Sequence, residues 1–378
     1  MGTATTGRPS GLAFISGGSA VNKLAALIAD RGLYASYLIS VFDNGGSTGR
    51  LRRAFGGFAL GDIRNRLVAL ARRDTLLARS ILELVSYRLT GNKPQEAFQA
   101  AVKSIAEGHS ELLRSIPAPS CQEISKAVSA LLERLPRGFD WRDAVVGNLV
   151  LQGRYFQLGD WASALHWMHG LLGARGLVMP VTAEAAHVGA RLANGRYVLG
   201  QSTITNEVNR IESPIQSVHL HPSEEYWGRL AHVKLYPGAK QELDAASAIV
   251  YTWGSFYTSV LCALLVDDLP RTIAESGVPK ILMLNPLRDA ETLGKTPVDL
   301  VRELSGFARG FASGKTITHV LALRPIAASG SFYTVKDRVP LERAGVDVIE
   351  LECDGIPQER HLHLAIDHLV RLALTEKR

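Results

Sequence analysis

Apolar and polar positions alternate in blocks at the beginning of the chain. The run GLAFISGG at 11–18 is apolar and ends in two glycines, and the next segment, SAVNKLAALIADRG, repeats apolar residues at helical spacing from Val21 to Ile28. Gly32 stands where a helix terminator is expected, and YASYLISVFD then has the composition of a second buried strand. This order predicts the opening strand, helix and strand of a Rossmann-like sheet, which is parallel because the crossover is helical.

The middle of the chain changes its period twice. From Gly61 to Gly176 almost every segment has a helical pattern. These are too many helices for each of them to be a single crossover between two strands of the sheet. We therefore expect a helical insertion over 66–176. Over 181–237 the period becomes two, in GRYVLGQSTI, IQSVHLHP and AHVKLYP, and a small β-rich section is expected there.

The last third returns to alternating strands and helices. The apolar runs AIVYTW, KILMLN, THVLAL and VDVIELE predict strands, and helices are expected near 257–276, near 296–313 and from Pro357 onward. The predicted fold is a single α/β domain over 11–378. It is a Rossmann-like three-layer sandwich with a mostly parallel sheet, to which the helical and β-rich insertions are added. Residues 1–10 are expected to form a flexible N-terminus.

Composition and charge narrow the class of protein. The chain is 46% hydrophobic and 21% charged, and no apolar run reaches the roughly 18 residues that a membrane span needs. The start, MGTATTGRPS, lacks the basic and apolar segments of a signal peptide, so we expect a cytoplasmic protein with no membrane partner. The net charge is +6, but only GRLRR and ARR cluster, both beside a glycine-rich segment. A small phosphorylated ligand explains this better than a nucleic acid, which needs an extended basic face.

Two glycine-bearing segments follow predicted strands. SGGSAVNK contains Gly17, Gly18 and Ser19, and TWGSFYTSV contains Gly254, Ser255 and Thr258 in the same position after a later strand. In a parallel sheet such segments meet at the carboxyl edge, where backbone amides and helix N-termini bind anions. Each segment alone is equally consistent with a tight turn or, for Ser255, with a simple helix cap.

A third segment, VFDNGGSTGRLR, has the densest chemistry of the chain. Asp43 ends the second strand, where a Rossmann protein binds a ribose. The residues after it match phosphate oxygens better than a sugar, because they supply backbone amides, hydroxyls and a guanidinium: Gly45, Gly46, Ser47, Thr48 and Arg50. The alternative is a glycine-rich surface turn with a capping aspartate. GDIRN adds Asp62, Arg64 and Asn65 at a predicted helix start, where a structural salt bridge is the alternative.

Other candidate chemistry is weaker. The histidines occur on amphipathic segments without carboxylate or cysteine partners at metal spacing, and we expect solvated helix faces for His166, His169, His361, His363 and His368. The Walker A lysine loop and C-x-x-C are missing from the sequence. Cysteines at three distant positions, 121, 262 and 353, are expected to be reduced and structural.

Taken together, these segments resemble those of the CofD/YvcK family, which contains 2-phospho-L-lactate transferases and YvcK-type gluconeogenesis or cell-envelope factors. The segments that carry the resemblance run in the family's order from about residue 12 to 305: SGGSAVNKL, VFDNGGSTGRLR, GDIRNRLVALA, VVGNLVL, TWGSFYTSV and NPLRDAETLGKTPVDLV. Asn44 stands where the family has a second aspartate, and TWGS replaces its PGS. The aspartate-rich loop of the transferases is missing, so the chain is most similar to a divergent branch nearer to YvcK, such as the CofD-related proteins of the GAK system.

The resemblance implies a cleft for a nucleoside-diphosphate-linked ligand of the GDP or UDP type. It implies that Asp43, Arg50 and Asp62 are catalytic, and that Asp43 also holds Mg²⁺. The implied nucleotide- and phosphate-binding residues are Gly17, Gly18, Ser19, Gly45, Gly46, Ser47, Thr48, Arg64, Asn65, Asn148, Gly254, Ser255 and Thr258. A homodimer is implied as well.

The resemblance leaves two functional hypotheses. The first is a transferase of a phosphoryl-linked group, in which a hydroxyl acceptor attacks a phosphate and a nucleoside monophosphate leaves. The alternative is a non-catalytic, YvcK-like regulator of carbon metabolism or cell-envelope synthesis that binds a nucleotide-sugar, and Asn44 favours it. A nicotinamide-dependent oxidoreductase ranks last because the full G-x-G-x-x-G is missing.

Overall fold

The computed structural model describes residues 11–205, 211–223, 228–309, 314–325, 331–353 and 358–375. The expected flexible N-terminus at 1–10 lies outside these residues. In the described part of the chain no helix has the length and apolar character to cross a membrane.

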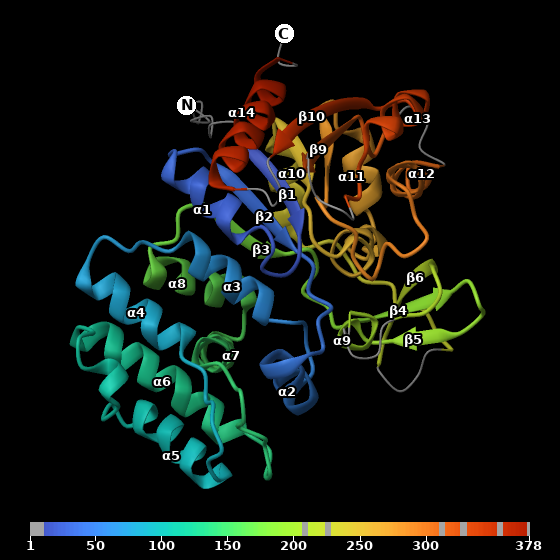
Figure 1. The fold of residues 1–378 in the computed structure, drawn as a ribbon. Coiled ribbons are helices and arrows are strands. Elements are labelled where there is room, and N and C mark those ends of the chain that lie inside the picture. Colours follow the sequence, from blue (N-terminus) through green and yellow to red (C-terminus); the bar gives the residue numbers. More distant parts are fainter. Residues whose placement is uncertain are drawn as a thin grey trace, which may run out of the picture.

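A seven-stranded sheet runs through the centre of the protein (Figure 1). Its order is β10-β9-β8-β7-β1-β2-β3, and every neighbouring pair is parallel. The strands are β1 (Leu12–Ser16), β2 (Ala35–Ile39), β3 (Leu177–Pro180), β7 (Ala248–Tyr251), β8 (Lys280–Leu284), β9 (His319–Pro325) and β10 (Asp347–Cys353). As predicted, the first and last parts of the chain share this sheet.

Helices cover both faces of the sheet, which explains why its strands read as continuous apolar runs. On one face, α1 (Asn22–Asp30) contacts both α3 (Gly61–Leu70) and α14 (Glu359–Thr375). The other face carries α10 (Pro237–Ala245), which precedes β7, and the helices that connect the later strands, α11 (Leu269–Glu275), α12 (Pro297–Gly306) and α13 (Arg338–Arg343). The predicted Rossmann-like three-layer α/β fold is confirmed.

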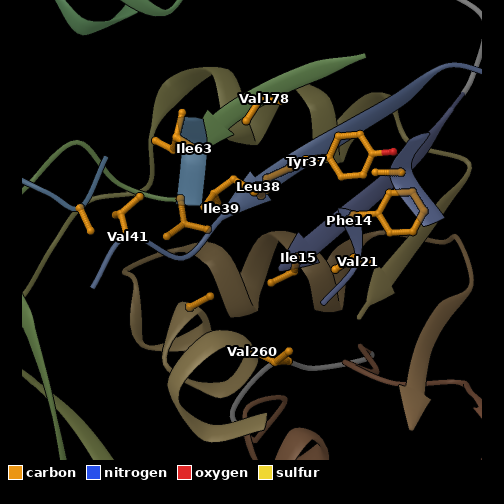
Figure 2. Packing of buried hydrophobic residues seen from close by; sticks show 14 of the residues in the cluster. Phe14, Ile15, Val21, Tyr37, Leu38, Ile39, Val41, Ile63, Val178 and Val260 are labelled. Atoms are coloured by element: carbon orange, nitrogen blue, oxygen red, sulfur yellow. The ribbon is translucent and has the colours of Figure 1, made fainter. Parts of the chain in front are cut away.

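Buried side chains from β1, β2, α3 and the segment after β7 pack together in one part of the core (Figure 2). Phe14 of β1 stacks on Tyr37 of β2 with ring centroids 5.1 Å apart, and both side chains are almost fully buried. Ile63 of α3 and Val260, which follows β7, reach the same cluster. The ends of β1 and β2 are therefore held rigidly, which matters because the candidate site begins there.

Helices fill the stretch between β2 and β3. After α2 (Gly46–Phe55) and α3 come α4 (Leu76–Ser86), α5 (Gln95–Ala106), the short η1 (Glu111–Leu113), α6 (Ala118–Arg134), α7 (Val146–Leu158) and α8 (Trp161–Leu172). From α4 to α8 they pack on one another as a bundle beside the sheet (Figure 1). The helices expected over 66–176 are thus present, while the insertion's boundaries stay a prediction.

A separate antiparallel sheet, with order β5-β4-β6, occupies much of the expected β-rich section. It consists of β4 (His187–Leu192), β5 (Tyr197–Leu199) and β6 (Ile215–His221), and α9 (Gln201–Ile204) follows β5. The expected strand AHVKLYP is wrong, because Lys234 forms only an isolated bridge to Asp267 and α10 begins at Pro237. An alternating pattern without a partner strand does not form a ladder.

Two further expectations are corrected. The helix expected over 257–276 is a six-residue π-helix, η2 (Phe256–Leu261), then η3 (Ala263–Leu265) and α11, because Asp268 takes a left-handed conformation with φ 64° before α11. The histidines do not all lie on solvated faces. His361 is buried, and His169 accepts a hydrogen bond from the backbone N–H of Val178 at 3.0 Å, which ties α8 to β3.

Candidate active site at the sheet edge

The three glycine-bearing segments follow β1, β2 and β7, which are direct neighbours in the sheet. From β1 the chain builds the sheet in one direction to β3, and from β7 it builds in the other direction to β10. The carboxyl ends of β1 and β7 therefore flank the point where the strand order reverses. Open α/β sheets bind their ligands at such a point.

The segments after β1 and β7 touch each other. A Cβ atom on Gly17 would lie 2.6 Å from the Ser259 hydroxyl oxygen, so this contact requires glycine. Trp253 donates its indole N–H to the Ala20 carbonyl at 3.1 Å. Gly18 has φ +43°, which turns the backbone after Gly17, and Ser19 beyond it is exposed.

Asp62, near the start of α3, holds the segment after β1. Its carboxylate accepts a hydrogen bond from the Gly18 N–H at 2.7 Å. Burial, together with the nearby negative charge of Asp43, raises the pKa of Asp62 to about 6, while the Gly18 hydrogen bond and the charges of Arg66 and Arg64 act in the opposite direction. Asp62 and Asp43, from different segments, therefore form a carboxylate pair at the edge of the sheet.

Asp43 and Asn44, which follow β2, have different contacts. Asp43 accepts a hydrogen bond from the Gly45 N–H at 3.0 Å, and burial raises the pKa of its carboxyl group. The Asn44 side chain turns to the small sheet, where its carbonyl oxygen accepts a hydrogen bond from the Ser202 N–H at 2.9 Å. Asn44 thus joins the site to α9.

The glycine-rich segment after Asp43 is not a loop, as the sequence suggested, but the beginning of α2. Gly45 is its N-cap in extended conformation, and Gly46 has φ +45°. The helix begins without a side-chain cap and without an acidic residue in its first turn. Since the first N–H groups of a helix have no intrahelical acceptor, this terminus favours an anion. Figure 1 shows α2 between the helical bundle and the small sheet.

Ser47, Asn148 and Arg64 form a chain of hydrogen bonds between α2, α7 and α3. The Ser47 hydroxyl oxygen accepts from the Val145 N–H at 3.0 Å and from the Asn148 side-chain amide at 3.1 Å. The Asn148 carbonyl oxygen accepts from Arg64 Nε at 3.3 Å. Arg64 is only 7% exposed, and its two terminal nitrogens have no hydrogen-bond partner among the residues that the structure describes. Ser47 and Asn148 therefore orient Arg64.

The remaining predicted residues of α2 and α3 lie apart from this chain. Arg50 turns to the helical bundle, where Nε pairs with the Asp140 carboxylate at 3.0 Å. Thr48 is buried against Gly61, and Asn65 is half-buried on α3. Of the three predicted catalytic residues, the structure thus brings Asp43 and Asp62 together and places Arg50 against a carboxylate of its own.

The segment after β7 already contains an anion, which the sequence reasoning missed. The Glu291 carboxylate accepts hydrogen bonds from the N–H groups of Tyr257 and Thr258, both at 3.0 Å, and from the Thr258 hydroxyl at 2.6 Å. Glu291 is 2% exposed, and burial raises its pKa to about 7. Asn285 brackets Gly254, donating to its carbonyl at 2.8 Å and accepting from its N–H at 2.7 Å. Glu291 and Asn285 both belong to the NPLRDAETLGK segment, and the resemblance of this segment to the family was the sign in the sequence that could have revealed them.

Two buried arginines were also missed. Arg52 donates to the Asp43 carbonyl at 2.9 Å and to the Ala186 carbonyl at 2.6 Å, and so connects α2 with the start of β4. Arg66 is wholly buried with its guanidinium 5.2 Å from the Tyr37 ring centroid. Arg66 donates to the Gly18 carbonyl at 3.4 Å. Both side chains support the backbone beneath the site.

A cleft of about 590 Å³ opens beside Ser255. This volume is in the range of sites for small ligands and cofactors. The segments after β7 and β8 line it together with the small β-rich section, through Thr205, Ile211, Ser255, Arg288, Asp289, Ala290, Glu291 and Leu293.

The donor atoms at the site suit Mg²⁺ better than a transition metal. Among the described residues no group of three or more histidine, cysteine, aspartate or glutamate side chains could hold a metal ion. Mg²⁺ is commonly held by one or two carboxylates together with substrate phosphates and water. Asp62 and Asp43, whose negative charge raises the pKa of Asp62, provide such a pair.

Known proteins are similar to this chain in sequence and in fold. The family described as 2-phospho-L-lactate transferase CofD matches residues 12–351. A Nostoc sp. protein named "Putative gluconeogenesis factor" is 28% identical over 77% of this chain, which spans only half of that relative's length. The Bacillus subtilis "Gluconeogenesis factor" is 25% identical over 79% of this chain and 75% of its own. A crystal structure of a upf0052 family member from Bacillus halodurans superposes with a TM-score of 0.70 and 21% identity, covering 96% of this chain and 99% of the other. The chain belongs to the CofD family.

Proposed function

We propose that the cleft at the sheet edge binds a nucleoside-diphosphate-linked ligand and transfers a phosphoryl-linked group from it to a hydroxyl acceptor. One observation carries the proposal: the uncapped start of α2, the unpaired end of the Arg64 guanidinium and the carboxylates of Asp43 and Asp62 meet at one place. The family description and the gluconeogenesis-factor relatives support a protein of this kind.

The positive groups suit a diphosphate. The start of α2 provides backbone N–H groups with the positive end of the helix dipole. Arg64 adds a planar guanidinium, which forms paired hydrogen bonds with phosphate oxygens. Because Ser47 and Asn148 fix its Nε side, Arg64 keeps its orientation when a ligand binds. The cleft beside Ser255 has room for the nucleoside.

The carboxylates suit the transfer step. The acceptor oxygen forms a bond to the phosphorus that carries the transferred group, and the bond from that phosphorus to the bridging oxygen breaks. The nucleoside monophosphate leaves with the electron pair of the broken bond. The acceptor's proton passes to Oδ1 of Asp62, whose Oδ2 stays bonded to Gly18. A pKa near 6 allows Asp62 to accept this proton at neutral pH. Asp43 would hold Mg²⁺, which reduces the negative charge of the phosphates.

Thermal melting with GDP and with a UDP-sugar, each with and without Mg²⁺, tests the binding step. A ligand at one hundred times its dissociation constant adds about 2.7 kcal/mol to the free energy of unfolding. We expect a shift that Mg²⁺ increases, and release of nucleoside monophosphate when a hydroxyl acceptor is added. A protein whose melting temperature responds to neither nucleotide would contradict the proposal.

The second candidate is a regulator that binds a nucleotide-sugar without turning it over. The Asn44 side chain favours it, because this residue is engaged with Ser202 and leaves Asp43 as the single carboxylate of its segment. For a regulator we expect a UDP-sugar shift that does not depend on Mg²⁺ and no monophosphate release. Phosphorus NMR of the bound ligand over time distinguishes the two candidates.

A further inference from the structure

Arg88 lies at the border between the helical bundle and the site, two residues after α4 ends. Its backbone pairs with Val145 in an isolated antiparallel bridge, and Leu89 donates to the Ala144 carbonyl at 2.9 Å. Val145 in turn donates its N–H to Ser47 of α2. The backbone of Arg88 is therefore fixed one residue away from the hydrogen-bonded chain that orients Arg64.

The Arg88 side chain is exposed and has no carboxylate partner among the residues that the structure describes. Within the described ranges, the side chain makes a hydrogen bond from Nη1 to the Asp143 carbonyl at 3.0 Å. The positive charge of Arg88 reaches Arg64. Burial and, to a lesser extent, the positive charge of Arg88 lower the pKa of Arg64 to about 10, while the charge of Asp62 acts in the opposite direction.

Two arginines thus share one carboxylate at this border. If Asp62 is ionised, the three side chains still carry one unbalanced positive charge. Arg50 lies on the neighbouring α2 but is balanced by Asp140, so the excess belongs to Arg64 and Arg88. Two like charges held near each other are unfavourable unless an anion joins them. The hydrogen-bonded chain from Ser47 to Asn148 prevents Arg64 from turning away.

We propose that Arg64 and Arg88 together form a binding site for an anionic group, a phosphate or a carboxylate, on the side of the candidate site that faces the helical bundle. This inference rests on the proposed function, because Arg64 belongs to the proposed diphosphate site as well as to this anion site. It adds Arg88, and with it the helical bundle, to the ligand site. The anion is either the terminal phosphate of the nucleotide or the anionic group of a separate substrate. Both would form paired hydrogen bonds with the guanidinium groups.

The test is Arg88→Ala, with Arg79→Ala as the matched control. Arg79 is an exposed arginine of α4 whose guanidinium donates to the backbone carbonyl of Arg73, so its removal changes the net charge equally. Calorimetric titration uses inorganic pyrophosphate, GDP, GMP and the corresponding uridine nucleotides. We expect Arg88→Ala to weaken pyrophosphate binding about tenfold, Arg88→Lys to restore part of it, and Arg79→Ala to leave it unchanged.

The nucleotides separate the two sources of the anion. If Arg88 holds the terminal phosphate, Arg88→Ala weakens GDP or UDP binding and leaves the monophosphates unchanged. If it holds a separate substrate, the nucleotide affinities stay unchanged and pyrophosphate binding to the nucleotide-saturated protein is weakened. Equal affinity of Arg88→Ala and the unsubstituted protein for every probe would overturn the inference, as would a protein that binds neither nucleotide nor pyrophosphate. Pyrophosphate binding that depends on Arg88 without any nucleotide binding would support the inference and refute the proposed function.

Discussion

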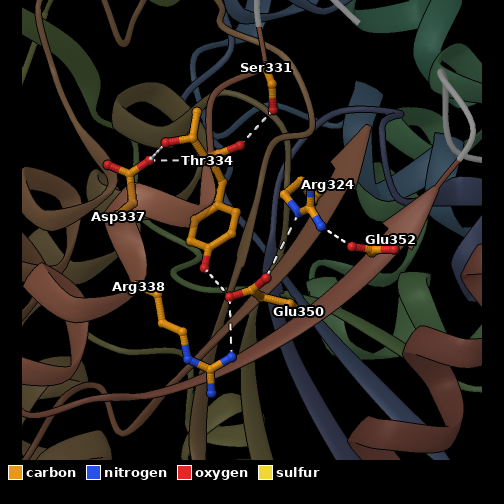
Figure 3. A network of polar contacts seen from close by, with 8 residues as sticks. Arg324, Ser331, Thr334, Asp337, Arg338, Glu350 and Glu352 are labelled. Carbon is orange, nitrogen blue, oxygen red and sulfur yellow. Dashed lines mark hydrogen bonds and ion pairs between the residues drawn. The ribbon is translucent and has the colours of Figure 1, made fainter. Parts of the chain in front are cut away.

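Two arginine clusters, one at the β9–β10 end of the sheet and one at the candidate site, differ in how their charges are balanced. Around β9 and β10, Arg324 pairs with Glu352 and lies near Glu350, and Arg338 of α13 pairs with Glu350 at 3.2 Å (Figure 3). Arg338 also pairs with Glu342 at 2.9 Å. At the candidate site, Arg64 and Arg88 have no such partners in the described part of the chain, and only Asp62 offsets their charge.

The polar contacts around Glu350 also show what a structural cluster looks like. The Tyr333 hydroxyl donates to Glu350 at 2.6 Å, and Thr334 and Asp337 close a capping box beside it. Every charged group in Figure 3 thus faces an opposite charge or a hydrogen-bond donor. The difference suggests a rule: balanced arginines hold elements together, whereas arginines that are fixed but unbalanced are arranged for a ligand.

The largest effect should come from removing Arg64. Arg64→Ala deletes the buried guanidinium that faces the ligand, and each charged hydrogen bond contributes about 1.5–3 kcal/mol. We expect the affinity for GDP or the UDP-sugar to fall about one hundredfold, measured by calorimetric titration. Arg324→Ala is the matched control, for which nucleotide affinity should stay unchanged. Equal losses in both variants would break the distinction between the clusters.

Removing Glu350 should have the opposite effect to removing Arg64: the stability of the fold should fall, and nucleotide affinity should not. Glu350→Ala leaves the hydroxyl of the buried Tyr333 without its acceptor, and a buried donor without a partner costs about 1–3 kcal/mol. We expect the free energy of unfolding in urea to fall by this amount while the nucleotide affinity is retained. Loss of nucleotide binding in the folded variant would show that this cluster also serves the ligand.

Asp62 should make both stability and activity depend on pH. Its pKa is raised from 3.8 to about 6 in the folded protein, so the folded state binds more protons than the unfolded state between these values. The contribution of Asp62 to stability is therefore complete below about pH 4 and is lost as the pH rises to 6. We expect Asp62→Asn to remove this dependence, a difference of about 1–2 kcal/mol in urea unfolding at pH 7 against pH 4. Transfer activity should rise through pH 6 in the unsubstituted protein. A stability difference that does not change with pH would contradict the raised pKa.

The smallest effect on stability should follow Asn44→Asp. An aspartate keeps the oxygen that accepts the Ser202 N–H, so the free energy of unfolding should change by less than about 1 kcal/mol. The variant places a second carboxylate after Asp43, and we expect the Mg²⁺ dependence of nucleotide binding to increase. Identical magnesium dependence in the variant and the unsubstituted protein would show that residue 44 does not contribute to metal binding, and would favour the regulator.

Local patterns predicted much of this protein. Each strand of the main sheet except β3 was expected from an apolar run of suitable length, and the start of α3 from GDIRN. The prediction failed at Gly46, where glycines suggested a loop and α2 begins, because packing decides whether a glycine-rich segment continues into a helix. It also failed for AHVKLYP, because the alternation of a segment does not reveal whether a partner strand is available.

The sequence by itself determined the sheet, the glycine-bearing segments at its carboxyl edge and the family to which the chain belongs. Only the tertiary structure decided which polar side chains are already engaged. Arg50 pairs with Asp140, 90 residues away, Thr258 with Glu291, 33 residues away, and Arg64 with Asn148, 84 residues away. A charged group binds a ligand only if no such internal partner satisfies it. Because these partners come from distant segments, they become visible only when the chain is folded.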